Sequence, residues 1–227
     1  MIIIGNPNKN KQKLKDLIFN IKIDQKYLTT SDLFRTEILQ NIRSDMTVLD
    51  VGKSMRQDFL KLECKEKKTL DINTFNDYPD IQLDLSEEIE IEKTELSEKF
   101  DVIICLAVLE HVYNPFIAVK NLKKMLKKNG IIYGYVPFLY HYHAPEDLYF
   151  QDYYRYSKDG LAYLFKDFQK IKLYPLRGRM SSAMHVLFGS IWKKTLERIK
   201  FNIFLDKFFS IKKNSKQAGG FNFIAIK

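Results

Sequence analysis

Residues 47–56, with the sequence TVLDVGKSMR, constrain the fold of this chain more than any other stretch. The β-branched and aliphatic residues around Asp50 predict a strand covered on both faces. Gly52 predicts a sharp turn or a close approach between backbone and ligand. In open α/β sheets, ligands bind beyond the carboxyl ends of the strands. The stretch therefore predicts a nucleotide-like ligand at this turn, without identifying it.

A second acid follows at the end of the next predicted strand. Asp71 lies in the segment 67–72, 21 positions after Asp50. A carboxylate about 20 residues beyond a glycine turn can accept both hydroxyl protons of a ribose. This spacing favours a ribose-binding role for Asp71 over a solvated strand end. A third predicted strand, 79–85, delivers another acid, Asp84.

Strand and helix patterns alternate along the chain, which predicts a parallel sheet with right-handed crossovers. A helix is expected over 116–128, where Asn129 and Gly130 stop it. Another is expected between Leu14 and Ile42, with an N-cap at residues 30–32. The remaining predicted strands are 100–106, 131–136, 170–174 and 221–227.

Length and cysteine content favour one cytoplasmic domain. A chain of 227 residues buries enough surface to fold without disulfide or metal staples. Of its two cysteines, Cys105 lies in an apolar run and is expected to be a small buried hydrophobe. The opening residues lack the pattern of a signal peptide, and no run approaches the roughly 20 apolar residues of a membrane span.

The net charge of +9 is concentrated in one region, residues 176–217, which holds ten basic and two acidic residues. Apolar and aromatic residues recur among these charges, as in amphipathic helices. A helical cap or homodimer interface is favoured there over peripheral contact with the inner face of the membrane. Nucleic acid ranks third, because no stacking platform is evident. The predicted organisation is a single domain, 1–227, with an N-terminal helical lead-in, 1–45, and a basic helical insertion, 176–219.

Several motifs together resemble the class I S-adenosylmethionine-dependent methyltransferases over residues 46–173. They are the three acid-tipped strands, LEHV at 109–112 and KNGII at 128–132. The chain is most similar to a bacterial subgroup in which the fifth strand runs into Pro-Phe, a histidine loop and an Asp-Tyr-Tyr-Arg-Tyr-Ser/Thr signature. Here these stand at 137–138, 143–145 and 152–157.

The resemblance implies an α/β fold: a Rossmann-like seven-stranded, mostly parallel sheet with an antiparallel last strand and helices on both faces. It implies S-adenosyl-L-methionine as cofactor. It also suggests O-methylation of a glycan, lipid-linked sugar or other small acceptor, in polysaccharide biosynthesis. Carried over by position, the cofactor-binding residues are Asp50, Gly52 and Ser54 at the first turn, Asp71 at the ribose, Asp84 and Leu85 at the adenine, and Leu106 at the cleft wall.

Two departures from the family pattern qualify these expectations. Lys53 and Ser54 follow Gly52 where small residues and a second glycine are usual. A catalytically inactive binding or scaffold protein is therefore the alternative function. Some relatives bind a divalent metal through Glu-x-x-Glu-His, but Ala107 replaces the first glutamate here, leaving Glu110 and His111. Hard divalent ions want several oxygen ligands, so no metal is expected.

Methyl transfer to a hydroxyl group requires a base near the acceptor. Imidazole titrates near physiological pH, so histidines at the two lips of the cleft are the catalytic candidates: His111, His141 and His143. Bonding to backbone or capping a helix is as strong an alternative for each. The aromatic and polar loop 140–155 is expected to hold the acceptor, with Tyr142, Asp152 and Arg155 as substrate-binding residues. An Asp152–Arg155 pair that supports the loop is slightly favoured over direct contact.

Overall fold

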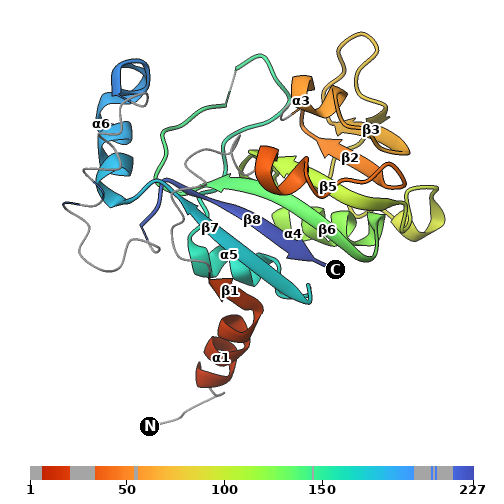
Figure 1. Cartoon of the computed structure of the whole chain (residues 1–227), viewed down its shortest axis with the longest axis horizontal. Helices are drawn as coiled ribbons and strands as arrows, with labels where there is room; N and C mark the ends of the chain where they lie inside the picture. The colour runs from red at the N-terminus through yellow and green to blue at the C-terminus, as the bar shows by residue number, and fades with distance from the viewer. Residues whose placement is uncertain are drawn as a thin grey trace.

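The computed structural model describes residues 7–20, 34–53, 56–144, 146–196, 206, 208 and 217–227. Its centre is one eight-stranded sheet in the order β1-β7-β8-β6-β5-β2-β3-β4 (Figure 1). All neighbouring strands are parallel except those beside β8, which is antiparallel to both β6 and β7. The strands are β1 (Ile18–Asn20), β2 (Thr47–Val51), β3 (Glu66–Asp71), β4 (Ile81–Gln82), β5 (Phe100–Leu106), β6 (Leu126–Pro137), β7 (Lys170–Leu176) and β8 (Gly220–Ile226).

Helices and short turns connect these strands. The Asn114 side chain accepts a hydrogen bond from the Ile117 amide at the start of α4, and Ser157 caps α5 in the same way through Gly160. The helices are α1 (Pro7–Leu17), α3 (Arg56–Leu60), α4 (Pro115–Met125), α5 (Lys158–Leu164) and α6 (Arg179–Leu196). Shorter elements are the π-helical turn η1 (Phe34–Ile38) and the 3-10 turns η2 (Ile91–Lys93) and η3 (Leu109–His111).

Core side chains alternate between the two faces of the sheet. Within β5, Ile103 and Cys105 join one buried cluster, together with α4 and α5 residues such as Leu122. Their neighbours Val102 and Ile104 join a second cluster that contains residues of η1 and α3. This period of two is what a strand covered on both faces requires. The Rossmann-like prediction of strands β2 to β8, with an antiparallel last strand and helices on both faces, is confirmed.

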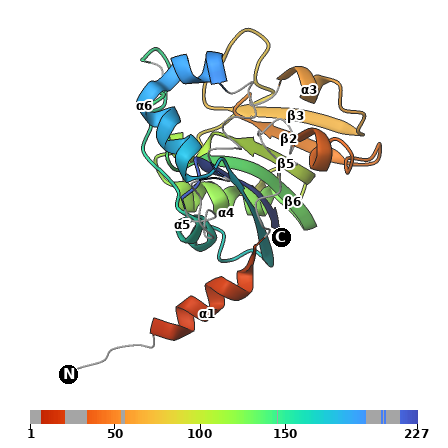
Figure 2. The ribbon, with the colours of Figure 1, turned by 60° about the vertical axis from the view of Figure 1, so that its left-hand side comes forward.

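The structure differs from the predictions at two helices. The helix expected over 116–128 ends at Met125, because Leu126 already pairs with Phe100 at the start of β6. Residues 18–20, expected to be helical, pair with β7 as an eighth strand. From there α1 projects beyond the edge of the sheet (Figure 2). The expected N-cap at 30–32 lies outside the described residues.

Helix α6 lies in the basic region 176–217. The carboxylate of Asp206 accepts hydrogen bonds from the Gly178, Met180 and Ser181 amides and so fixes the beginning of the helix. The buried His185 packs its ring 5.0 Å from that of Tyr140, which follows β6. Among the described residues, no helix is long and apolar enough to cross a membrane. Contact of this region with a membrane surface or a second copy stays a prediction.

Candidate functional site

A cavity of about 200 Å³ opens at the carboxyl ends of β2, β3 and β5. Strand ends form its base, and side chains that follow β4, β5 and β6 form its walls. This is the edge of the sheet where the sequence predicts a ligand. The lining residues are Val51, Gly52, Leu70, Asp71, Ile72, Leu83, Asp84, Leu85, Ser86, Ala107, Val108, His111, Val112, Tyr113, Tyr149, Phe150 and Tyr153.

Gly52 shapes the turn at the base of this cavity. Its φ angle is +76°, and a Cβ atom there would lie 2.5 Å from Cγ2 of Val108. Its amide donates a 2.9 Å hydrogen bond to the carbonyl of Leu70, which ties the turn to β3. Both the backbone conformation and the close approach to Val108 therefore require glycine.

The Asp71 carboxylate is held in place from both of its oxygens. Oδ1 accepts hydrogen bonds from the Asn73 amide at 2.9 Å and from the Asn73 side chain at 3.3 Å. Oδ2 accepts from the hydroxyl of Tyr78 at 2.9 Å. Burial, and then the neighbouring Asp71, raise the pKa of Tyr78, which keeps that hydroxyl protonated as a donor. These three hydrogen bonds fix the orientation of the Asp71 carboxylate at the wall of the cavity.

Lys53 points toward the same loop. Its Nζ lies 5.0 Å from the ring centroid of Phe75 and 5.2 Å from that of Tyr78, within the range of cation–π contacts. The residue that departs from the family pattern therefore supports the aromatic pair beside Asp71. Ser54, the other departure and a predicted cofactor-binding residue, lies outside the described residues.

Asp84 and Leu85 follow β4 and border the cavity. Their contact with adenine stays a prediction. Oδ1 of Asp84 accepts a 2.8 Å hydrogen bond from the Ser86 amide, which orients the carboxylate. The buried Asn121 of α4 donates to the carbonyls of Leu85 at 3.2 Å and Glu87 at 2.9 Å. This segment is thus fixed to the body of the domain.

Two predicted cofactor-binding residues do not border the cavity. Asp50 is buried within β2, with 1% of its surface exposed. Leu106 is buried in the core cluster that contains η1 and α3, so it is not the residue that forms the cavity wall after β5. Ala107 and Val108 take that place. The side chain of Leu106 packs into the core because side chains alternate along β5, and the wall begins only where the strand ends.

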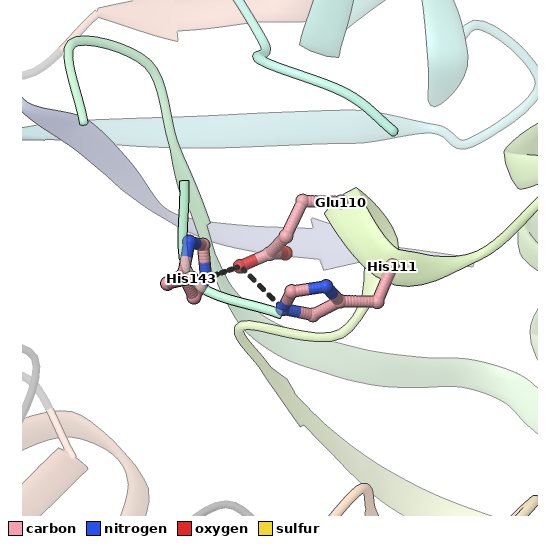
Figure 3. Close-up of side chains that lie close together, drawn as sticks. All are labelled: Glu110, His111 and His143. Carbon is pink, nitrogen blue, oxygen red and sulfur yellow. Dashed lines mark ion pairs between the residues drawn. The ribbon is translucent and has the colours of Figure 1, made fainter. Parts of the chain in front are cut away.

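Glu110, His111 and His143 come together beside the cavity (Figure 3). Oε1 of Glu110 lies 3.6 Å from Nε2 of His143 and 3.9 Å from Nε2 of His111. The Glu110 side chain is fully buried, and neither carboxylate oxygen has a hydrogen-bond partner among the described residues. The imidazole rings meet edge to face, with centroids 4.7 Å apart. Two of the three histidine candidates therefore lie together around Glu110, which the sequence places beside His111 without assigning it a role.

Both imidazoles are oriented through Nδ1. In His111 this atom lies 2.9 Å from the carbonyl of Gln151. In His143 it lies 3.2 Å from the carbonyl of His141 and 3.1 Å from Oδ2 of Asp152. Glu110 is the main cause that raises the pKa of His143, and Asp152 acts in the same direction while burial opposes both. Glu110 and Asp152 thus flank His143 with negative charge.

The remaining predicted residues belong to the loop after β6. Arg155 binds the carboxylate of Asp152 and donates to the carbonyl of His141 at 2.8 Å. Burial alone would raise the pKa of Asp152, but hydrogen bonds from Arg155 and from the His143 amide lower it to about 2. His141 is exposed, and its ring stacks on Tyr140 outside the Glu110 group. Tyr142 is also exposed and donates to the Gln151 side chain at 3.2 Å.

This loop also reaches across to the side of the cavity that is formed by Asp71. The Tyr149 amide donates a 3.0 Å hydrogen bond to Oδ1 of Asn73, the same residue that binds Asp71. Nearer β5, the Tyr153 and Tyr154 amides both donate to the carbonyl of Glu110, at 2.8 and 3.1 Å. Asn73 and Tyr149 were missed in the sequence, where the aromatic density of the loop was the only signal. The loop therefore forms one wall of the cavity.

The residues present fit a nucleoside ligand. The glycine turn leaves space at the backbone, two oriented carboxylates face the cavity, and Leu85 and Tyr113 offer apolar contact. The Glu110 group borders the same cavity through His111. The arrangement can hold a nucleoside beside a group that assists loss of a proton.

Known proteins resemble this chain in sequence and in fold. Residues 26–178 match the family described as "Methyltransferase domain". A SAM-dependent methyltransferase from Archaeoglobus fulgidus has a similar structure, with a TM-score of 0.51 and 16% identity, covering 87% of this chain and 92% of that chain. The complex between the Haloferax volcanii Trm112 methyltransferase activator and a methyltransferase contains another, with a TM-score of 0.54, 11% identity and coverage of 97% and 94%. These two likenesses show a shared fold.

Two curated relatives match shorter segments. The ubiquinone biosynthesis O-methyltransferase of Glaesserella parasuis serovar 5 (strain SH0165) is 46% identical over 37 residues, which are 16% of each protein. That of Histophilus somni (strain 2336) is 35% identical over 52 residues, 23% of this chain and 22% of the relative. The matched segments thus span less than a quarter of these relatives.

Proposed function

The chain belongs to the methyltransferase domain family, and we propose that it transfers the methyl group of S-adenosyl-L-methionine to a hydroxyl group of a glycan, lipid-linked sugar or other small acceptor. One observation carries this proposal: the cavity beside Gly52, Asp71 and Asp84 also borders the Glu110–His111–His143 group. A cofactor site and a site for proton removal are therefore adjacent.

S-adenosyl-L-methionine supplies an electrophilic methyl carbon, so the protein has to bind, orient and exclude water. Asp71 accepts hydrogen bonds from the ribose hydroxyl groups, while Asp84 and Leu85 contact the adenine. Gly52 leaves room for the methionine part. The oriented carboxylates of Asp71 and Asp84 support these roles.

A hydroxyl acceptor loses its proton as the new bond to carbon forms. The Glu110 group is the place beside the cavity where the chain gathers a carboxylate and two imidazoles. The acceptor therefore lies between this group and the cofactor, with the loop after β6 as its outer wall. Oxygen is preferred as the methylated atom because the two curated relatives are named O-methyltransferases.

The acceptor class is supported by the side chains at the rim. Tyr113, Tyr149 and Tyr153 line the cavity and are also among the exposed aromatic residues. Such rings stack on the apolar faces of sugars and offer a hydroxyl at the edge. In the loop itself, Asp152 and Arg155 bind each other and position His143. Their support of the loop is therefore preferred over direct contact with the acceptor.

Titration calorimetry with S-adenosyl-L-methionine tests the cofactor, and mass spectrometry of glycan and small hydroxyl acceptors incubated with it tests the transfer. We expect one cofactor site per chain and gain of one methyl group on an acceptor oxygen. A dissociation constant of 1 mM corresponds to a binding free energy of only about 4 kcal/mol. Absence of binding at about 1 mM cofactor would therefore refute the proposal. If only nitrogen or carbon atoms were methylated, the protein would still be a methyltransferase, but the proposal of a hydroxyl acceptor would be wrong.

A further inference from the structure

Within the described part of the chain, the carboxylate of Glu110 is buried without the hydrogen bonds that a buried charge normally has. Its carboxylate is fully buried, and neither oxygen has a hydrogen-bond partner among the described residues. Burying an ionised group is costly unless a partner compensates its charge. The nearest polar side-chain atoms recorded beside it are Nε2 of His111 and Nε2 of His143 (Figure 3).

In each imidazole ring, the hydrogen-bond partner of Nδ1 determines whether Nε2 carries a proton or a lone pair. The Nδ1 atoms of both histidines face acceptors: the Gln151 carbonyl for His111, and the His141 carbonyl with the Asp152 carboxylate for His143. An acceptor can only be met by an N–H, so each Nδ1 carries the proton. In the neutral rings, both Nε2 lone pairs then point toward a carboxylate. Lone pairs and a negative charge repel one another unless a positive species lies between them.

We infer that Glu110, His111 and His143 bind one transition-metal ion of the Zn²⁺ type. One ligand atom from each residue lies within 4.8 Å of the other two. In a tetrahedral zinc site with bonds of about 2.0 to 2.1 Å, ligand atoms stand about 3.3 Å apart. The separations of 3.6 and 3.9 Å from Glu110 Oε1 exceed that value by roughly 0.3 and 0.6 Å. The separation between the two imidazole nitrogens, which is within 4.8 Å, must also shorten when the ion binds.

The ligand set selects the kind of ion. Two imidazole nitrogens and one carboxylate oxygen suit Zn²⁺ and similar transition metals, whereas Mg²⁺ and Ca²⁺ require mostly oxygen ligands. The sequence argument against a metal considered hard ions and only Glu110 and His111. The fold adds His143, which stands 32 positions later.

The surroundings of the histidines also match a metal site. Metal-binding imidazoles commonly donate their other ring N–H to a carbonyl or carboxylate, which fixes the ring. Gln151, His141 and Asp152 supply these acceptors. Asp152 is fixed in turn by Arg155. The loop after β6 thus supplies one ligand and both sets of supporting contacts.

The role of the ion rests on the proposed function. Three protein ligands leave one position open, and His111 places the ion at the wall of the cavity. An acceptor hydroxyl bound there would lose its proton to solvent more readily, because the cation lowers its pKa. The acceptor oxygen then forms the bond to the methyl carbon as the carbon–sulfur bond breaks and its electron pair stays on sulfur. The histidines act as ligands in this scheme.

The experiment uses the full chain, stripped with chelator and titrated with Zn²⁺ alone by calorimetry. We expect one Zn²⁺ ion per chain, bound with micromolar or tighter affinity. The affinity should fall by about tenfold to a hundredfold in Glu110→Gln and in His143→Ala. Cys64→Ser is the matched control: it removes a partly exposed soft ligand outside the cluster and should leave the affinity unchanged. Co²⁺ in place of Zn²⁺ should give visible absorption bands that His143→Ala abolishes.

Absence of Zn²⁺ binding, or equal binding by wild type and His143→Ala, would overturn the inference and leave a proton as the positive species between the ligands. His143 lies on a loop, so His143→Ala remains informative if Glu110→Gln fails to fold. A separate titration of the chelator-treated protein with S-adenosylhomocysteine tests the cofactor site independently of the metal. Binding of that ligand without Zn²⁺ binding rejects the metal alone, and failure to bind it rejects the proposed function.

Discussion

The two sides of the cavity are built in different ways. On the cofactor side, the two carboxylates are oriented by local contacts: Asp71 is bound by residues two and seven positions away, and Asp84 by one two positions away. On the acceptor side, the imidazole of His111 is oriented by a distant contact, with a carbonyl 40 positions away. Strand ends therefore hold the first side, whereas a network of side chains and a loop hold the second. We expect substitutions on the first side to affect mainly cofactor affinity and those on the second mainly turnover.

Asp71→Ala should have the largest effect. It removes a carboxylate expected to make two charge-assisted hydrogen bonds to ribose, each worth about 1.5 to 3 kcal/mol. The dissociation constant for S-adenosylhomocysteine should rise by about a hundredfold or more, measured by calorimetry. Asp77→Ala, at an exposed carboxylate on the same loop, should bind like wild type. An unchanged affinity in Asp71→Ala would refute the ribose role.

Gly52→Ala should weaken the cofactor side through the backbone. The φ angle of +76° is unfavourable for alanine, and the new Cβ would lie 2.5 Å from Cγ2 of Val108. We expect the free energy of unfolding, measured by urea denaturation, to fall by about 1 to 3 kcal/mol. The double variant Gly52→Ala/Val108→Ala removes the clash and leaves the strained φ. If the double variant is no less stable than Val108→Ala alone, backbone strain contributes nothing here.

The same contrast explains what the sequence could predict. Strand patterns and the spacing from Asp50 to Asp71 are local features, so they located the sheet and the cofactor edge. Leu106 was expected at the cleft wall, whereas the cavity is lined from Ala107 onward, where the chain leaves β5. Its contact with the cofactor stays a prediction. Glu110 was noted only as part of a metal motif that lacks its first glutamate, because the sequence gives no sign that its side chain is buried beside a second histidine. Its partnership with His143 exists only once β5 and β6 lie side by side.

Asp152→Asn should slow turnover without changing the affinity for the cofactor product. The amide keeps the shape of the side chain but loses the charge that binds Arg155 and faces Nδ1 of His143. Loss of such supporting contacts typically costs 10- to 100-fold, and we expect about tenfold slower turnover. Affinity for S-adenosylhomocysteine should change by less than about twofold, since Asp152 does not border the cavity. The exposed Asp147→Asn on the same loop is the control. Equal losses of affinity and turnover in Asp152→Asn would break the proposed division.

Asn73→Ala should have the smallest effect and act on both sides at once. Asn73 is buried, and its side chain donates to Oδ1 of Asp71 at 3.3 Å and accepts the Tyr149 amide through Oδ1, so it joins the strand ends to the loop. A neutral hydrogen bond contributes about 0.5 to 1.5 kcal/mol, which corresponds to roughly threefold to tenfold in affinity for S-adenosylhomocysteine. Hydrogen exchange at the Tyr149 amide should accelerate, because that amide loses its acceptor. The neighbouring exposed Thr74→Ala should change neither quantity. Faster exchange at Tyr149 with unchanged affinity would mean that the loop packs against the cofactor side without supporting it, and the two sides would then be independent.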